Sequence, residues 1–157
     1  MFAEPTTELE PLSMLSVALI RHPEQLEASW LAVLNEPADE LSLITASRSE
    51  GTSWRDCLDQ KIADALLVRR GKDYIISKMP RLNFEDVIQV GPLQQQMAVA
   101  FFVVDLYGRN ARAAIDHDPR TVWVSNRELR QGTSDCGIPF APHLCELLRR
   151  ADVIRNF

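Results

Sequence analysis

Apolar and polar residues follow two different periods along the chain. Short runs that are continuously apolar or alternate with polar residues, bounded by turn-forming residues, predict strands. The run at 97–106 is apolar at nearly every position, so we expect it to be buried on both faces in the middle of a sheet. The predicted strands cover residues 14–21, 30–34, 41–45, 74–77, 84–90, 97–106 and 121–124.

Three segments carry apolar residues at helical spacing. The clearest begins after Ser53, which is placed as an N-cap, and is predicted to continue as far as Gly71. A helical turn is predicted after Ser125 and is stopped by Gly132. An amphipathic helix over 142–153 closes the chain, with a proline well placed in its first turn.

The order of these elements predicts an α+β fold in one domain. Residues 1–12 contain two prolines and several acidic residues, which favours a flexible N-terminal arm. We therefore expect a single domain at 13–157, a length that can bury a sizeable core.

Composition narrows the function classes. The 157 residues are 46% hydrophobic and 25% charged, with a net charge of -5, from which we predict no nucleic-acid partner. No apolar run is long enough to cross a bilayer, so no membrane partner is expected. Three cysteines without motif spacing, and an acidic N-terminus unlike a signal peptide, predict a cytoplasmic protein.

One stretch resembles the signature of a known family. The segment from Ala46 to Val68 is similar to a degenerate Nudix box, whose consensus is G-x(5)-E-x(7)-R-E-U-x-E-E-x-G-U, with U an aliphatic residue. The later string VWVSNREL at 122–129 resembles the family's W-V-S-x-x-E-L signature. The resemblance spans about residues 14–153 and implies a Nudix-like α/β/α sandwich, with a mixed β-sheet between helices.

The departures from the consensus fall on the residues that carry the chemistry. In the family, carboxylates on one face of the box helix bind Mg²⁺, a cation that prefers oxygen ligands. Here Thr52, Lys61 and Ala65 stand at three of the glutamate positions, and Asp64 alone keeps a carboxylate, as a weak remnant of the metal site. Leu67 replaces the box glycine, so the helix is expected to continue past it.

The resemblance implies a Nudix-fold protein with an eroded metal site, which is catalytically inactive and acts as a nucleotide-binding or protein-interaction module. Its ligand would be a nucleotide or another small phosphorylated molecule. Five basic residues are candidates to line the old pyrophosphate pocket, because a cation can hold phosphate without a metal. They are Arg48, Lys61, Lys72, Lys78 and Arg81.

Two alternatives remain open. The first is a divergent hydrolase that uses Mg²⁺ to cleave the pyrophosphate of a nucleoside diphosphate linked to another moiety, with Glu50, Asp64 and Glu85 as its carboxylates. The second is a structural subunit or homodimer with an empty pocket. Neither the polar turn at 116–118 nor the set Cys136, His143 and Cys145 matches a common metal-binding pattern.

Overall fold

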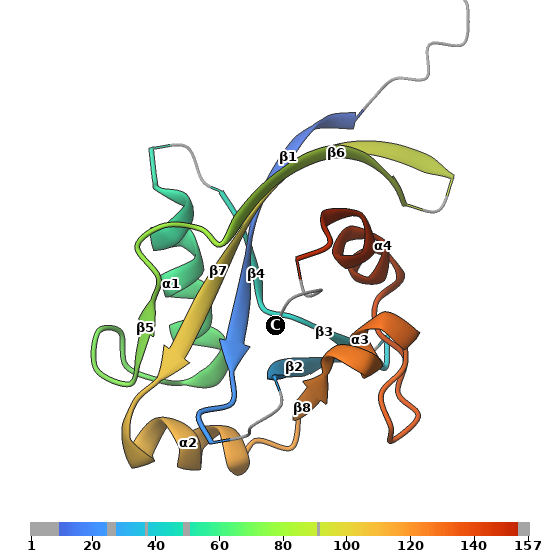
Figure 1. The fold of residues 1–157 in the computed structure, drawn as a ribbon. Helices are drawn as coiled ribbons and strands as arrows, with labels where there is room; N and C mark the ends of the chain where they lie inside the picture. The colour runs from blue at the N-terminus through green and yellow to red at the C-terminus, as the bar shows by residue number, and fades with distance from the viewer. Residues whose placement is uncertain (1–9, 25–27, 37, 49–50, 91, 154–157) are drawn as a thin grey trace, which may run out of the picture.

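The structure is a computed structural model that describes residues 10–24, 28–36, 38–48, 51–90 and 92–153. Its helices and strands form one mixed sheet of eight strands with helices on both faces, which confirms the predicted α+β class (Figure 1). The elements follow in the order β1 (Glu10–Arg21), β2 (Ser29–Asn35), β3 (Glu40–Ser42), β4 (Thr45–Ser47), α1 (Trp54–Leu66), β5 (Tyr74–Ile76), β6 (Leu82–Val90), β7 (Leu93–Leu106), α2 (Gly108–Asp116), β8 (Thr121–Ser125), α3 (Asn126–Gln131) and α4 (Pro142–Ala151).

Strands β1 and β7 form the centre of the sheet. They run parallel over most of their length, with Val17 opposite Phe101. β6 forms an antiparallel hairpin with β7, and β5 pairs with the C-terminal end of β7. On the other side, β4 and β2 pair with β1, and β3 and β8 pair with β2. The prediction that 97–106 is a central strand is therefore confirmed.

The alternation of side chains along β1 divides the core into two layers. Val17 and Leu19 point into the layer that α3 and α4 cover, whereas Ala18 and Ile20 point into the layer that α1 and α2 cover. All four side chains are buried. Each helix pair thus closes one face of the same sheet (Figure 1).

Three boundaries differ from the sequence predictions. β1 begins at Glu10, inside the range assigned to the N-terminal arm; the rest of that arm lies outside the described residues. The strand predicted at 41–45 is divided between β3 and β4, which pair with different partners. No helix is predicted directly after the strand at 97–106, yet α2 begins there, and its Ala111 and Ile115 lie one turn apart and are buried against the sheet.

Candidate functional site

Helix α1 is held so that one side packs on the sheet and the other faces an open cleft. The hydroxyl of Ser53 accepts a hydrogen bond from the backbone N–H of Asp56 at 3.1 Å, which confirms the predicted N-cap. Leu58, Ile62 and Leu66 are buried at helical spacing. The polar positions between them are therefore directed away from the core.

The helix ends earlier than predicted. Leu67 adopts a left-handed conformation with φ 55° and ends α1 there, although it is not glycine. Its side chain is 84% exposed, so no packing compensates for the unfavourable backbone geometry. The expectation that the helix continues to Gly71 is wrong, because contacts between residues four positions apart fix a tight turn there instead.

Asp73 makes those contacts. Its buried carboxylate accepts hydrogen bonds from the backbone N–H of Arg69 at 2.7 Å and from the Arg69 guanidinium at 3.1 Å. These interactions with Arg69 hold the pKa of Asp73 below its usual range. The resulting tight turn brings Arg70 back alongside α1.

A chain of hydrogen bonds then runs along the exposed side of α1. The Tyr74 hydroxyl donates to Asp59 Oδ1 at 2.5 Å, and Arg70 bridges Asp59 Oδ2 at 3.1 Å and Gln60 Oε1 at 3.0 Å. Gln60 in turn donates to Asp64 Oδ1 at 2.9 Å. Burial, and next the Asp59 carboxylate, raise the pKa of Tyr74 well above its usual value, so its hydroxyl stays protonated as the donor.

The cleft beside α1 has a volume of about 750 Å³ and is lined mostly by polar side chains. Its walls come from β4, from α1 and from the turn that follows α1. The lining residues are Thr45, Ala46, Ser47, Thr52, Asp56, Cys57, Gln60, Lys61, Asp64 and Arg70.

The donor set of the cleft does not fit Mg²⁺. Lys61 presents an ammonium to the cleft, and Asp56 and Asp64 are the carboxylates among its lining residues. Ala65, at another consensus glutamate position, packs against the core on the α1 side of the sheet. Within the described ranges, no cluster of three or more His, Cys, Asp or Glu side chains could hold a metal ion. Glu50, a candidate ligand, lies outside those ranges. Two carboxylates beside a lysine, one of which already accepts a hydrogen bond from Gln60, are a poor site for a hard divalent cation.

Few of the sequence candidates meet in the cleft. Lys61 and Asp64 both line it, and Arg48 lies nearby, with its guanidinium 5.5 Å from the centroid of the Trp54 ring. Lys78 and Glu85 are exposed and are not among the lining residues.

Two other basic candidates are also set apart from the cleft. Arg81 lines a separate recess of about 420 Å³ together with Arg21 and Asp105. Lys72 lies exposed in the turn after α1 and does not line the cleft. The predicted phosphate pocket of five basic residues is therefore not assembled as one site.

Sequence reasoning missed Arg70, and Thr45 and Ser47 of β4, as residues that line this site. Arg70 lies beyond the end of α1 and turns back toward Gln60. Alternation along β4 gave no signal for Thr45 and Ser47, because Ala46 between them is the side chain buried in the layer of α1.

The chain matches no known family model and no curated protein. It does match solved structures. NrtR of Shewanella oneidensis is 14% identical, with a TM-score of 0.56 over 88% of this chain. The RenU Nudix hydrolase of M. smegmatis is 12% identical, with a TM-score of 0.55 over 91% of this chain and 86% of RenU. The chain has the Nudix fold. Ap4A hydrolase of C. elegans shares this fold, at 5% identity and a TM-score of 0.56 over 92% of this chain and 94% of the hydrolase.

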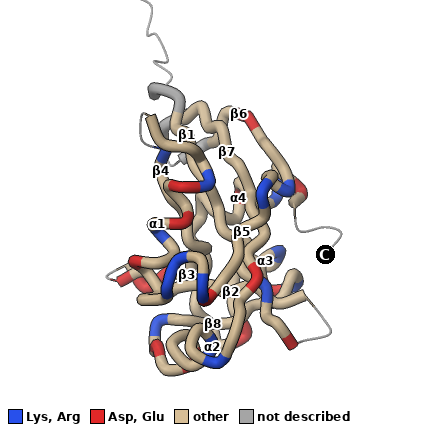
Figure 2. Tube along the Cα trace, turned by 90° about the vertical axis from the view of Figure 1, so that its left-hand side faces the viewer, with Lys and Arg blue, Asp and Glu red and all other residues tan. Residues whose placement is uncertain are grey.

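The comparison with NrtR corrects one sequence-based exclusion. This chain spans about 60% of the length of NrtR. NrtR has also been crystallised with a 27mer DNA, and that structure matches with a TM-score of 0.57. The prediction that this chain has no nucleic-acid partner is therefore wrong. The net charge is a sum over the whole chain and does not show where charges lie, and basic and acidic residues are interspersed along it (Figure 2). No helix in the described part of the chain is long and apolar enough to cross a membrane.

Proposed function

We propose that this Nudix-fold protein binds a nucleotide in the cleft beside α1 and does not hydrolyse it. The observation that carries the proposal is the presence of Lys61 in the cleft, at a position that the resemblance assigns to a glutamate. An ammonium at position 61 repels a divalent cation but attracts the phosphates that the cation would bridge.

Asp56 and Asp64 balance Lys61 and Arg70 among the residues that line the cleft, and one of the two cations remains available to a phosphate. Arg70 is already bound to Asp59 and Gln60, and Asp64 accepts a hydrogen bond from Gln60. Lys61 is exposed and has no ion-pair partner among the residues that the structure describes. It is therefore the cation with free capacity for an anionic group.

The dimensions and other donors of the cleft suit a nucleotide. Its volume of about 750 Å³ lies within the usual range for small-molecule sites. Thr45, Ser47 and Thr52 are also among its lining residues and add neutral polar groups to the cleft.

Calorimetric titration with ADP and with UDP-glucose, each in Mg²⁺ and in EDTA, tests the proposal. We expect saturable binding that does not require Mg²⁺. Lys61→Ala should weaken it about tenfold, which corresponds to about 1.4 kcal/mol for the loss of one charge-assisted contact. Lys78→Ala is the matched control, since this exposed lysine lies outside the cleft, and its affinity should equal that of the wild type.

Two results would contradict the proposal. If neither nucleotide bound, the proposal that the ligand is a nucleotide would be wrong. If Lys61→Ala and Lys78→Ala weakened the affinity equally, the proposal that the nucleotide binds in the cleft would be wrong. Hydrolysis of UDP-glucose to UMP and glucose 1-phosphate that depends on Mg²⁺ would restore the hydrolase alternative, in which Asp64 acts with Glu50 and Glu85.

A further inference from the structure

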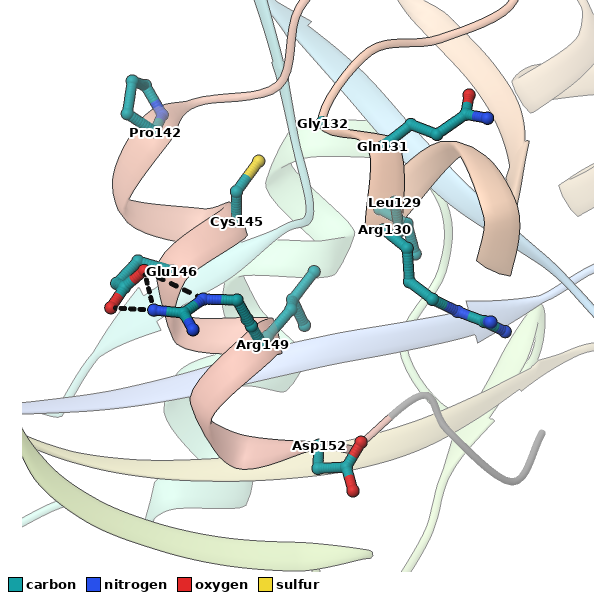
Figure 3. A pocket seen from close by; sticks show the side chains of 10 residues that line it. Leu129, Arg130, Gln131, Gly132, Pro142, Cys145, Glu146, Arg149 and Asp152 are labelled. Carbon is teal, nitrogen blue, oxygen red and sulfur yellow. Dashed lines mark hydrogen bonds and ion pairs between the residues drawn. The ribbon is translucent and has the colours of Figure 1, made fainter.

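A second hollow lies between α3 and α4, on the face of the sheet opposite the cleft (Figure 3). Its volume is about 660 Å³. Leu129 of α3 and Leu148 of α4 line it and are buried, so its base is apolar. Cys145 adds a half-buried wall, and burial raises the pKa of its thiol, which keeps the group neutral at pH 7. We call this hollow the α3–α4 pocket.

The α3–α4 pocket is preformed by local hydrogen bonds. Ser125 and Glu128 make a reciprocal capping box at the start of α3, and Glu128 Oε2 also accepts a hydrogen bond from the backbone N–H of Asp135 at 2.9 Å. Gly132 ends α3 with φ 79°, a conformation that a side chain would strain. A Cβ at Gly132 would lie 3.7 Å from the sulfur of Cys145, an ordinary contact distance, so glycine is favoured here by its backbone conformation.

The free charge at the rim of the pocket is positive. Glu146 accepts hydrogen bonds from Arg149 at 2.8 Å and from Arg150 at 2.7 Å, so its negative charge is already compensated. Asp152 is engaged as well. Arg130 is exposed at the rim and, among the residues described, has no ion-pair partner. Figure 3 shows its side chain extending from α3 beside the pocket.

We propose that the α3–α4 pocket binds a small organic acid, whose apolar body rests on Leu129, Leu148 and Cys145 and whose carboxylate meets Arg130. The volume is that of typical small-molecule sites, which combine an apolar lining with a few polar groups that fix orientation. A polyphosphate would leave this apolar base unfilled. The ligand class therefore differs from that proposed for the cleft beside α1.

An NMR titration with 2-naphthoate, followed through backbone amide signals, tests this proposal directly. We expect saturable shifts at Gly132 and Cys145. The neutral analogue 2-naphthalenemethanol should bind about fivefold more weakly, the upper range for one exposed ion pair. Arg130→Gln should weaken binding of the acid by the same factor and should not change the affinity for the alcohol. Arg127→Gln is the matched control, because Arg127 lies on α3 but pairs with Asp135 outside the pocket lining.

A pocket-filling variant gives a second measure. Cys145→Phe should abolish the shifts at Gly132, because the larger ring occupies the space of the ligand. The inference is overturned by shifts that do not saturate, or that occur at residues outside the α3–α4 pocket. Equal affinity for the acid and the alcohol would also overturn it. So would the finding that the protein self-associates through this pocket and that Cys145→Phe removes the association. Lys61→Ala should leave this titration unchanged, so failure of the nucleotide proposal is distinguishable from failure of this one.

Discussion

The cleft beside α1 and the α3–α4 pocket lie on opposite faces of one sheet and are built from different side chains. In the cleft, polar groups bind one another: Tyr74, Asp59, Arg70, Gln60 and Asp64 form a continuous chain of hydrogen bonds. In the pocket the base is apolar, and the charges lie at the rim. The same fold thus presents a polar site on one face and an apolar site on the other.

The difference underlies the two ligands that we propose. In the chain beside α1, each carboxylate accepts a hydrogen bond from a protein donor: Asp59 from Tyr74 and Arg70, and Asp64 from Gln60. These hydrogen bonds orient the carboxylates without a metal. Arg130 at the rim of the α3–α4 pocket has no ion-pair partner among the residues described, and for this reason we propose an acidic ligand there.

The largest expected effect tests whether the two faces form one cooperative unit. Leu58→Ala in α1 and Leu147→Ala in α4 each truncate a side chain that is fully or nearly fully buried. Each should lower the free energy of unfolding by about 2 to 5 kcal/mol, measured by urea denaturation in a single transition. Leu67→Ala, at an exposed position, is the control and should stay within about 0.5 kcal/mol of the wild type. A loss below about 1 kcal/mol on either face would show that its helix is not held by this core.

Restoring carboxylates sharpens the contrast on the α1 side. The triple variant Thr52→Glu, Lys61→Glu, Ala65→Glu adds three carboxylates at the consensus positions, beside Asp56 and Asp64, which already line the cleft. We expect Mg²⁺ to stabilise this variant by about 1.4 kcal/mol at tenfold excess over its dissociation constant, measured by thermal unfolding. The wild type and Lys78→Glu should show no such stabilisation. An equal response of the wild type would mean that the native cleft already binds the metal.

A smaller gain is expected at the end of α1. Leu67→Gly removes the strain of a left-handed leucine and should raise the free energy of unfolding by about 0.5 to 1 kcal/mol. Leu67→Ala keeps a Cβ in the same conformation and should not share the gain. If the glycine variant were less stable in urea than the alanine variant, the strain assigned to this position would be absent.

The smallest effect is a pH dependence at the turn after α1. Because Arg69 lowers the folded-state pKa of Asp73, this carboxylate stabilises the protein above its unfolded pKa, and that stabilisation is lost as pH falls through the lower, folded value. Asp73→Asn should therefore be less stable than the wild type at pH 7, and the difference should shrink toward pH 3 in urea denaturation. A difference that is constant across this range would contradict the assignment.

Local signals explain which parts of the fold the sequence predicts. The caps Ser53, Ser125 and Gly132 act on residues within a turn of themselves, and all three are confirmed. The start of α2 was missed because the run Tyr107-Gly108-Arg109-Asn110 has turn chemistry, while the packing of Ala111 and Ile115 decides the helix. The end of α1 was missed because it depends on the buried carboxylate of Asp73.

The candidate site divides in the same way. Lys61 and Asp64 were identified because helical spacing places them on one side of α1, and both line the cleft. Charge alone groups Lys78 and Arg81 with these residues. In the structure neither residue lines the cleft, and Arg81 lines a separate recess. Arg70 reaches Gln60 through a loop that turns back, and the α3–α4 pocket depends on how two helices pack. Neither arrangement produces a periodic pattern of residues in the sequence.

Phosphorus NMR of a nucleoside diphosphate linked to a sugar, mixed with the protein and Mg²⁺, tests the central account most directly. The two phosphate signals should broaden or shift as the ligand binds in the cleft, and Lys61→Ala should reduce that change. No phosphomonoester signal should appear with time. A phosphomonoester that grows only when Mg²⁺ is present would show that the cleft hydrolyses its ligand, and would contradict the account.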